Sequence, residues 1–392
     1  MERVSISVLA VLMALFATPL FLDLALCVFG NFFRARNPKV PLFQNIRVAV
    51  VVPAHDEEAM IARTVESLKA ADPATSIFVV AHNCTDGTAT AAANAGARVV
   101  ELNNRKLRGK GAALRHGFTA ALASGANAIL VVDADSVVSP NLIAATCAKL
   151  EQGAEATQCR YELELPTGGT GNPLARLRAL AFRGMNVMRA RGRAGLGFST
   201  GLFGNGFALT AAALERVPFN ADSIAEDVEY HTKLVQAGIQ VYWVNDAFVL
   251  GHSPASGAAK ATQEARWEGG RFRVAGRATA QLISAALRGK WRALETLADV
   301  WSLPLSRGIL ALLLTSFLAV HWLHFFALVC TAIALLYVFQ AALLGNDPVR
   351  DLAALVAAPL YLLWKALITP LVLRQSRSRA EWARTKREAH QP

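Results

Sequence analysis

Short runs of β-branched residues alternate with helix-favouring stretches over residues 47–161, and this alternation constrains the fold more than any other feature. The runs cover residues 48–53, 76–81, 97–102, 128–133 and 156–161, and the helical stretches cover 58–70, 88–95, 109–123 and 140–151. Apolar strands separated by helices predict a mostly parallel sheet that is covered on both faces. Sheets of this kind bind ligands outside the carboxyl ends of their strands. The sequence therefore predicts an α/β domain with its site at that edge.

Two carboxylates, Asp133 and Asp135, follow the fourth apolar run with one residue between them. Mg²⁺ and Mn²⁺ prefer carboxylate and phosphate oxygens, so this pair predicts a cation held between the protein and a diphosphate. A D-x-D pair also occurs by chance in many chains, and solvated acids in a turn are the alternative interpretation.

Other loops at strand ends also carry polar side chains. Arg108 and Lys110 lie beside glycines at the expected start of a helix, an arrangement that favours anions, although no G-x-x-x-x-G-K-[ST] phosphate loop is present. For Arg108 and Lys110 the alternative interpretation is a solvated basic turn. For the acidic residues after the first run it is the ordinary enrichment of acids at the start of a helix. The first run ends at Pro53, and the loops after the first two runs contain His55, Glu57, His82 and Asp86.

Three groups of residues that follow the alternating region are also candidate site residues. Glu226 and Asp227 begin a helical stretch over 224–238, where they are either first-turn acids or a general base. The Q-x-x-R-W sequence over 263–267 is either an amphipathic face with a snorkelling arginine or part of a site. Between these two groups a strand is expected over residues 239–244. The third group lies in the glycine-rich segment 195–210 and contains Gly204, Asn205 and Gly206.

Apolar segments flank this region and predict membrane attachment. Residues 6–29 are long and apolar enough to cross a bilayer, with Asp23 expected near one interface. The basic residues that follow place the next segment in the cytosol. Residues 309–344 and 352–373 are also strongly apolar, and the sequence leaves the number of crossings (two or three) open. The expected boundaries are 1–30 for an N-terminal transmembrane helix, 46–271 for the catalytic domain, 272–304 for amphipathic interface helices, 305–373 for C-terminal transmembrane helices and 374–392 for a basic cytosolic tail.

The overall composition narrows the class of protein. Hydrophobic residues make up 54% of the chain and the formal net charge is +11, which suits a membrane protein with an anionic partner. The basic residues lie beside apolar spans and phosphate-type loops instead of on one aromatic-lined face, so a nucleic-acid partner is not expected. The five cysteines include no C-x-x-C pair, which suits a reducing compartment.

Taken in order, these motifs resemble the family 2 glycosyltransferases of GT-A fold. The resemblance is strongest to the membrane-embedded branch that contains cellulose, hyaluronan and poly-N-acetylglucosamine synthases and ceramide glucosyltransferase. The D-x-D, T-E-D and Q-x-x-R-W motifs of that branch correspond here to Asp133 with Asp135, to Ala225-Glu226-Asp227 and to Gln263, Arg266 and Trp267.

The resemblance implies a metal-dependent, inverting glycosyltransferase at the cytoplasmic face of the inner membrane, with Mg²⁺ or Mn²⁺ as cofactor. Asp135 would bind the metal and Asp133 the nucleotide or the metal shell, while Asp227, beside Glu226, would be the general base. Gln263, Arg266, Trp267 and the segment around Asn205 would line the acceptor or diphosphate site. Residues expected to bind the donor are Pro53, His55, Glu57, His82, Asp86, Lys110, Asp133 and Asp135.

The chain departs from the branch at two positions. His82 replaces an aspartate that contacts uracil, and Ala225 replaces the threonine of T-E-D. A UDP-sugar donor and a polysaccharide or lipid acceptor are expected, with an accessory export subunit as a further partner to consider. Processive synthesis and single transfer to a glycolipid both stay open. The rival from another class is a non-catalytic membrane transporter or receptor subunit with a nucleotide-sensing domain.

Overall fold

The computed structural model describes residues 2–38, 45–107, 109–165, 172–221, 223–252, 257–302, 304–315 and 320–377. Arg108 and residues 378–392 of the predicted tail lie outside the described residues. The strands are β1 (Val48–Ala54), β2 (Ser76–His82), β3 (Arg98–Leu102), β4 (Ala128–Val131), β5 (Ser136–Val138), β6 (Ala156–Leu163), β7 (Phe207–Thr210) and β8 (Val241–Gly251).

Helices connect and cover these strands. In the catalytic region they are α2 (Glu58–Ala71), α3 (Thr88–Asn94), α4 (Lys110–Ala123), α5 (Leu142–Glu151), α6 (Pro173–Arg183), the π-helical turn η2 (Gly184–Met188), α7 (Arg189–Leu196), α8 (Ala211–Arg216) and α9 (Glu226–Ala237). The flanking helices are α1 (Glu2–Gly30), α10 (Gly257–Leu287), α11 (Arg292–Trp301), α12 (Leu305–Thr315), α13 (His321–Leu343), α14 (Pro348–Ala353), the 3₁₀ turn η3 (Ala354–Ala357), α15 (Ala358–Leu367) and α16 (Thr369–Arg377).

The strands form one mixed sheet in the order β3-β2-β1-β4-β7-β6-β8-β5. The pairs β3–β2, β2–β1, β1–β4 and β6–β8 are parallel, whereas β7 runs antiparallel to both of its neighbours. The carboxyl ends of β1, β2 and β4 therefore share one edge. The predicted α/β class is confirmed, but the short strands β5 and β7 were not expected, and the strand predicted over 239–244 runs on to Gly251.

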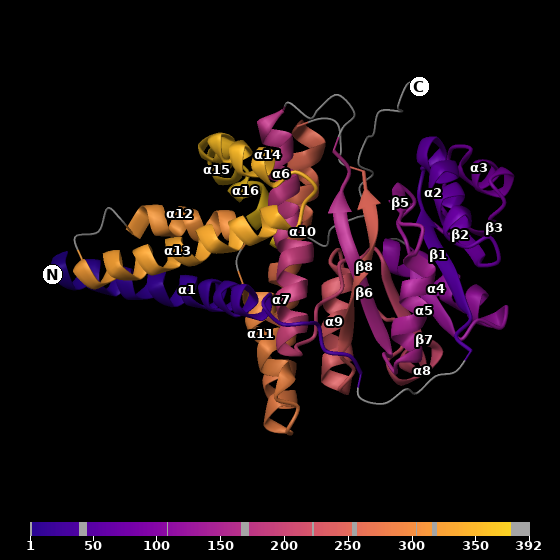
Figure 1. Cartoon of the computed structure of the whole chain (residues 1–392), viewed down its shortest axis with the longest axis horizontal. Helices are drawn as coiled ribbons and strands as arrows, with labels where there is room; N and C mark the ends of the chain where they lie inside the picture. The colour runs from indigo at the N-terminus through magenta and orange to yellow at the C-terminus, as the bar shows by residue number, and fades with distance from the viewer. Residues whose placement is uncertain are drawn as a thin grey trace.

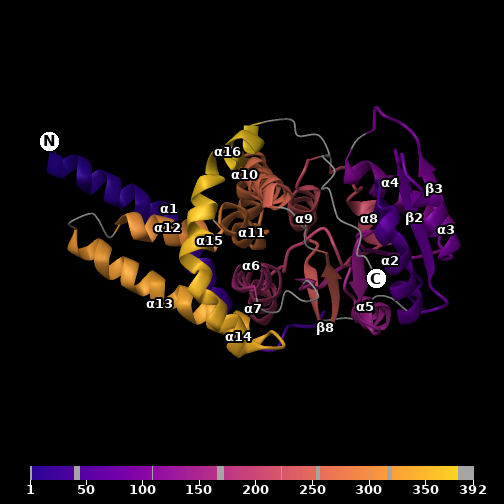
Figure 2. The ribbon, with the colours of Figure 1, turned by 90° about the horizontal axis from the view of Figure 1, so that it is seen from above.

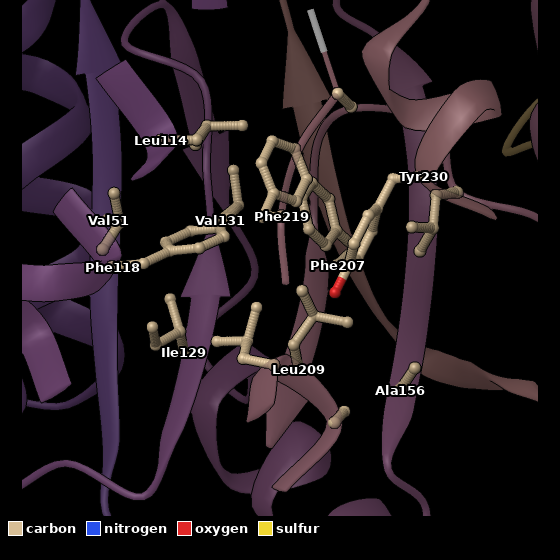
Figure 3. Close-up of a cluster of buried hydrophobic side chains, with 14 of the residues drawn as sticks. Val51, Leu114, Phe118, Ile129, Val131, Ala156, Phe207, Leu209, Phe219 and Tyr230 are labelled. Atoms are coloured by element: carbon tan, nitrogen blue, oxygen red, sulfur yellow. The ribbon is translucent and has the colours of Figure 1, made fainter. Parts of the chain in front are cut away.

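Each face of the sheet buries a separate hydrophobic core. One core contains Leu114 and Phe118 of α4 and Tyr230 of α9, packed on Val51, Ile129 and Phe207 of the strands (Figure 3). The other core contains apolar side chains of α2 and α5, including Ile61 and Leu142. Because β-branched and aromatic side chains project from both faces of the strands, both layers of helices are required to bury them.

Among the described residues, two helices are long and apolar enough to cross a membrane, over Val11–Gly30 and His321–Leu343, and the bent pair α11–α12 would make a third if it counts as one span. In Figure 1 α1, α12 and α13 extend side by side away from the sheet, while α10 and α11 run across their direction. The predicted apolar block over 309–344 contains α12 and α13, and the block over 352–373 is divided among the end of α14, η3, α15 and α16. Figure 2 shows α14, α15 and α16 crossing over this bundle.

Helix α1 meets the catalytic domain through direct backbone contact with α7. A Cβ added to Gly192 would lie 2.2 Å from the carbonyl oxygen of Cys27, and one added to Gly195 would lie 2.0 Å from that of Gly30. Small residues of this kind allow helices to approach closely. The contact fixes the predicted transmembrane helix on the domain that carries the site.

Asp23 of α1 is buried at this contact, with only 4% of its surface exposed, instead of lying at an open interface as expected from the sequence. Its carboxylate accepts hydrogen bonds from Arg189 (2.6 Å) and Arg193 (2.9 Å) of α7. A buried charge is tolerated when it is paired in this way. Asp23 therefore joins α1 to the domain that contains the sheet.

Candidate active site

A cavity of about 1020 Å³ opens at the carboxyl ends of β1 and β4 and continues to the apolar helices. Most of the residues predicted from the sequence line it: Pro53, His55, Glu57, Lys110, Asp133, Asp135, Gly204, Glu226, Asp227, Gln263, Arg266 and Trp267. Residues far apart in the chain are thus gathered around one space.

The D-x-D turn is held from two sides. Strand β4 ends at Val131, two residues earlier than predicted, so Asp133 and Asp135 lie in the turn before β5. From α2, Thr64 donates its hydroxyl proton to the carbonyl of Ala134 (2.8 Å). Asn205 accepts from the Asp133 amide (3.1 Å) and donates to the hydroxyl of Ser136 (2.9 Å). These bonds determine where the carboxylates point.

Lys110, at the start of α4, connects three sides of the site. Its Nζ lies 2.5 Å from Asp133 and 3.8 Å from Glu226, and it donates a hydrogen bond to the carbonyl of Gly204 (2.7 Å). Gly204 has a φ of 76°, which an L side chain rarely adopts, so this position favours glycine. Burial alone would lower the pKa of Lys110, but Asp133 and Glu226 together raise it. The ammonium therefore stays charged beside the carboxylates.

Glu226 and Asp227 occupy the first turn of α9 and line the cavity, Glu226 buried and Asp227 half-buried. Burial raises the pKa of Glu226 to about 7, with Lys110 partly opposing the shift. Burial also raises the pKa of Asp227, against a hydrogen bond to Asp227 Oδ1 from the amide of Val228 (2.8 Å). A carboxylate with a raised pKa is a better proton acceptor, as a general base requires.

The Q-x-x-R-W turn belongs to α10, which crosses the start of α9. A Cβ added to Gly270 would lie 3.1 Å from that of Ala225, so the glycine allows the two helices to approach. Trp267 is 38% exposed, and its ring packs against Phe182 with a centroid distance of 5.9 Å. The amide oxygen of Gln263 accepts from Arg178 (3.1 Å). One turn of α10 thus presents three polar or aromatic groups to the cavity.

Of the predicted site residues that the structure describes, His82, Asp86, Asn205 and Gly206 do not line the cavity. His82 is buried and its Nε2 lies 2.9 Å from the carbonyl of Leu107, and burial lowers its pKa. Because a carbonyl only accepts, Nε2 carries the proton and the ring is neutral.

Asp86, Asn205 and Gly206 hold or pack the backbone around the site. Asp86 accepts from the amides of Thr88 (3.0 Å) and Glu58 (3.3 Å), which ties the starts of α3 and α2 together. Asn205 holds the D-x-D turn. A Cβ on Gly206 would lie 2.4 Å from the sulfur of Cys159, so this position requires glycine for close packing.

Two groups of side chains offer ligands to a cation. Asp133 and Asp135 line the cavity, and their oxygen donors fit Mg²⁺ or Mn²⁺. Asp56, Cys84 and Asp86 have ligand atoms within 4.8 Å of one another. In that second group the carboxylates already accept backbone amide protons, for example from Thr85 to Asp56 (2.6 Å), so the D-x-D pair is the better candidate.

The far end of the cavity is apolar. It is lined by aliphatic and aromatic side chains of the flanking helices, including Leu20, Leu24, Ile309, Val338 and Leu362. No motif in the sequence indicated that these residues share a space with Asp227. Thr64, Arg178 and Phe182 were missed for the same reason, since only the fold brings them to the motifs.

Comparison with known proteins agrees with this arrangement. The model of the family described as "Glycosyltransferase like family 2" matches residues 45–270, which is more than half of the chain. The chain therefore belongs to glycosyltransferase family 2 and is an enzyme of that class.

Individual relatives are more distant. Protein RfbJ of Shigella flexneri is 34% identical over 94 residues, which is 24% of this chain and 68% of that protein. The mannosyltransferase PcManGT of Pyrobaculum calidifontis, solved in complex with GDP-Man and Mn²⁺, is 18% identical with a TM-score of 0.52, covering 90% of this chain and 98% of that one. Glucosyl-3-phosphoglycerate synthase of Mycobacterium tuberculosis is 20% identical with a TM-score of 0.43, covering 61% and 87%. The PcManGT likeness supports the GT-A fold.

Proposed function

We propose that the enzyme transfers a sugar from a nucleoside-diphosphate sugar to a hydroxyl group of a membrane lipid, at the cytoplasmic face of the inner membrane. The observation that carries the proposal is the cavity, which runs from the carboxylate of Asp227 to the apolar side chains of α1, α12, α13 and α15. A lipid acceptor has the matching shape, with a polar head at the carboxylate and hydrocarbon at the other end.

The donor is assigned to the sheet edge. Lys110 would contact the diphosphate, and Pro53, His55 and Glu57 line the part of the cavity next to β1 where the nucleoside would bind. A UDP-sugar is the first candidate, and a GDP-sugar is the second because PcManGT holds GDP-Man. His82 lies outside the cavity lining, so base selectivity is assigned to His55 and its neighbours.

Asp133 and Asp135 would hold Mg²⁺ or Mn²⁺ against the diphosphate. When bound, the cation supplies positive charge that stabilises the leaving group. The Lys110 ammonium stabilises the same group from the protein side.

Asp227 is assigned as the general base. It would take the proton of the acceptor hydroxyl as the hydroxyl oxygen bonds to the anomeric carbon and the bond from that carbon to the diphosphate breaks. Attack opposite the leaving group inverts the configuration. Glu226, with its pKa of about 7, provides a second buried carboxyl group beside the base.

A lipid acceptor is favoured over a growing polysaccharide by the chemistry of the cavity walls. A chain of sugars is polar along its whole length and requires hydrogen-bonding or flat aromatic surfaces. Aliphatic walls such as those made by Leu24, Leu177 and Ile309 would leave its hydroxyl groups unpaired, which is costly. Hydrocarbon is favourable there.

Membrane attachment fits the exposed apolar side chains of the flanking helices. On α1 and α13, Leu15, Phe16, Phe325 and Leu328 are each more than half exposed. Such a surface is expected to face lipid. The basic residues after α1 support a cytosolic position for the catalytic domain.

The test is transfer from radiolabelled donor by purified enzyme in lipid nanodiscs with Mn²⁺. UDP-sugars and GDP-sugars would be supplied one at a time, with either a total lipid extract or soluble oligosaccharides as acceptor. Label that enters the organic phase as a product with one added sugar supports the proposal. Label in a water-soluble polymer, or none with lipid while oligosaccharides are extended, refutes the lipid assignment.

A further inference from the structure

A buried lysine outside the recognised motifs contacts α10 next to the Q-x-x-R-W turn. Lys365 of α15 is 3% exposed, and its Nζ donates to Glu264 (2.6 Å) and to Glu268 (2.8 Å). These two carboxylates lie four residues apart, on successive turns of α10. One ammonium therefore bridges both turns.

Two arginines complete the arrangement. Arg307 of α12 donates to the second oxygen of Glu268 (2.8 Å and 3.1 Å), and Arg178 of α6 donates to the second oxygen of Glu264 (3.4 Å). Each carboxylate oxygen of the pair thus has a cationic partner from a helix other than α10. Helices α6, α12 and α15 are all held to α10 by this cluster.

The cluster also contacts Gln263, the first residue of the Q-x-x-R-W motif. Arg178 also donates to the amide oxygen of Gln263 (3.1 Å). Since a guanidinium has only donors, the group facing it must be the amide oxygen, and the amide nitrogen of Gln263 is left to donate elsewhere. The side-chain orientation of Gln263 therefore depends on Arg178, which in turn is paired with Glu264.

The positions of the motif residues follow from helix geometry. Arg266 and Trp267 lie between Glu264 and Glu268 on α10, and Gln263 directly precedes Glu264. Side chains three and four residues apart lie on one face of a helix. Holding the carboxylates of Glu264 and Glu268 therefore restricts both the rotation of α10 about its axis and the movement of this turn relative to the cavity. A displacement of about 1 Å at a reacting site can reduce turnover by about a hundredfold.

We infer that Lys365 is a positioning residue for the transfer reaction: it bridges Glu264 and Glu268 and so holds the turn of α10 that presents Gln263, Arg266 and Trp267 to the cavity. Lys365 borders the cavity, but its Nζ is engaged by two carboxylates, so it acts through α10. The inference rests on the proposed function in assigning those three residues to the transfer.

The test compares Lys365→Met with Lys365→Arg in full-length enzyme in nanodiscs. Lys365→Met is expected to lower kcat about 10- to 100-fold, with the KM values for donor and lipid changed less than about threefold. Lys365→Arg, which can still bridge two carboxylates, should restore most of kcat. The matched control is Asp351→Asn, which loosens another buried ion cluster between α14 and α6, with Arg176 and Arg183, away from α10. It should lower the melting temperature while kcat is kept.

A third variant separates positioning from folding. The variant Lys365→Gln keeps a polar side chain but loses the charge that bridges both carboxylates, while Glu264 and Glu268 keep Arg178 and Arg307 as cationic partners, so it is expected to fold while its kcat stays low. Wild-type kcat in the folded Lys365→Gln variant overturns the inference. So does a rise in lipid KM with unchanged kcat in Lys365→Met, which would indicate direct contact with the acceptor. If wild-type enzyme transfers no sugar to lipid, the proposed function fails, whereas normal kcat in Lys365→Met refutes only the positioning role.

Discussion

Replacing Asp227 by asparagine tests the assignment of the base while keeping the shape of the side chain. In the wild-type structure Oδ1 of Asp227 accepts from the amide of Val228 (2.8 Å), and the amide oxygen of asparagine can accept the same bond. Burial raises the pKa of Asp227, which means that its charge is costly in the folded state. The variant should therefore fold at least as stably as the wild type.

The expected loss follows from the role assigned to the carboxylate. General-base catalysis contributes about 10²- to 10⁴-fold, which corresponds to about 3 to 5 kcal/mol in the activation free energy. Donor binding should be retained or slightly tighter, because a negative charge near Lys110 and the diphosphate is removed. The loss is thus expected in kcat, with little change in donor KM.

The assay is steady-state release of nucleoside diphosphate together with label incorporated into lipid. Glu226→Gln is the matched control, because Glu226 precedes Asp227 directly, lines the same cavity and undergoes the same isosteric change. We expect it to lower kcat by about tenfold or less. The reasoning is refuted if Asp227→Asn keeps more than a tenth of wild-type kcat, or if Glu226→Gln is the more damaging change.

Four further outcomes are expected. Because burial raises the pKa of Asp227, kcat should fall with decreasing pH from a point above the ordinary aspartate pKa of 3.8, which a pH profile at saturating substrate checks. Because burial raises the pKa of Glu226 from 4.5 to about 7, its protonated form stabilises the fold at low pH, and this stabilisation is lost as pH rises through about 7. Above pH 7, Glu226→Gln should therefore have a free energy of unfolding up to about 3 kcal/mol higher than the wild type, as measured by denaturant unfolding. Chelation should abolish transfer, and added Mn²⁺ should restore it in the wild type but not in Asp135→Ala. Asp23→Asn leaves two arginines of α7 short of a buried partner and should cost about 3 to 5 kcal/mol in unfolding measurements, with an unchanged melting temperature contradicting the assigned contact.

Much of the site could be predicted because a parallel sheet gathers its strand ends. Asp133 and Asp135 follow β4, and His55 and Glu57 follow β1, its neighbour in the sheet. Once the alternation of strands and helices is recognised, these side chains must share one edge. The family likewise followed from the order and spacing of short motifs along the chain.

Other features required the tertiary structure. The surroundings of His82 and Asn205 depend on which loops lie beside them: one is buried against the carbonyl of Leu107, and the other holds the D-x-D turn. The short strand β7 has no alternation of its own to reveal it, and only its two neighbours in the sheet define it.

The class of fold, the family and the chemistry of the motifs can be predicted from the sequence, because they depend on local periodicity and on residue types at close spacing. The pairing of Asp23 with α7, the pairing of Lys365 with α10 and the apolar cavity between Asp227 and the flanking helices depend on tertiary packing. Each of these contacts joins residues about 100 or more positions apart. The partner of a buried charge is set by which helices pack together, and the local sequence pattern does not contain that information.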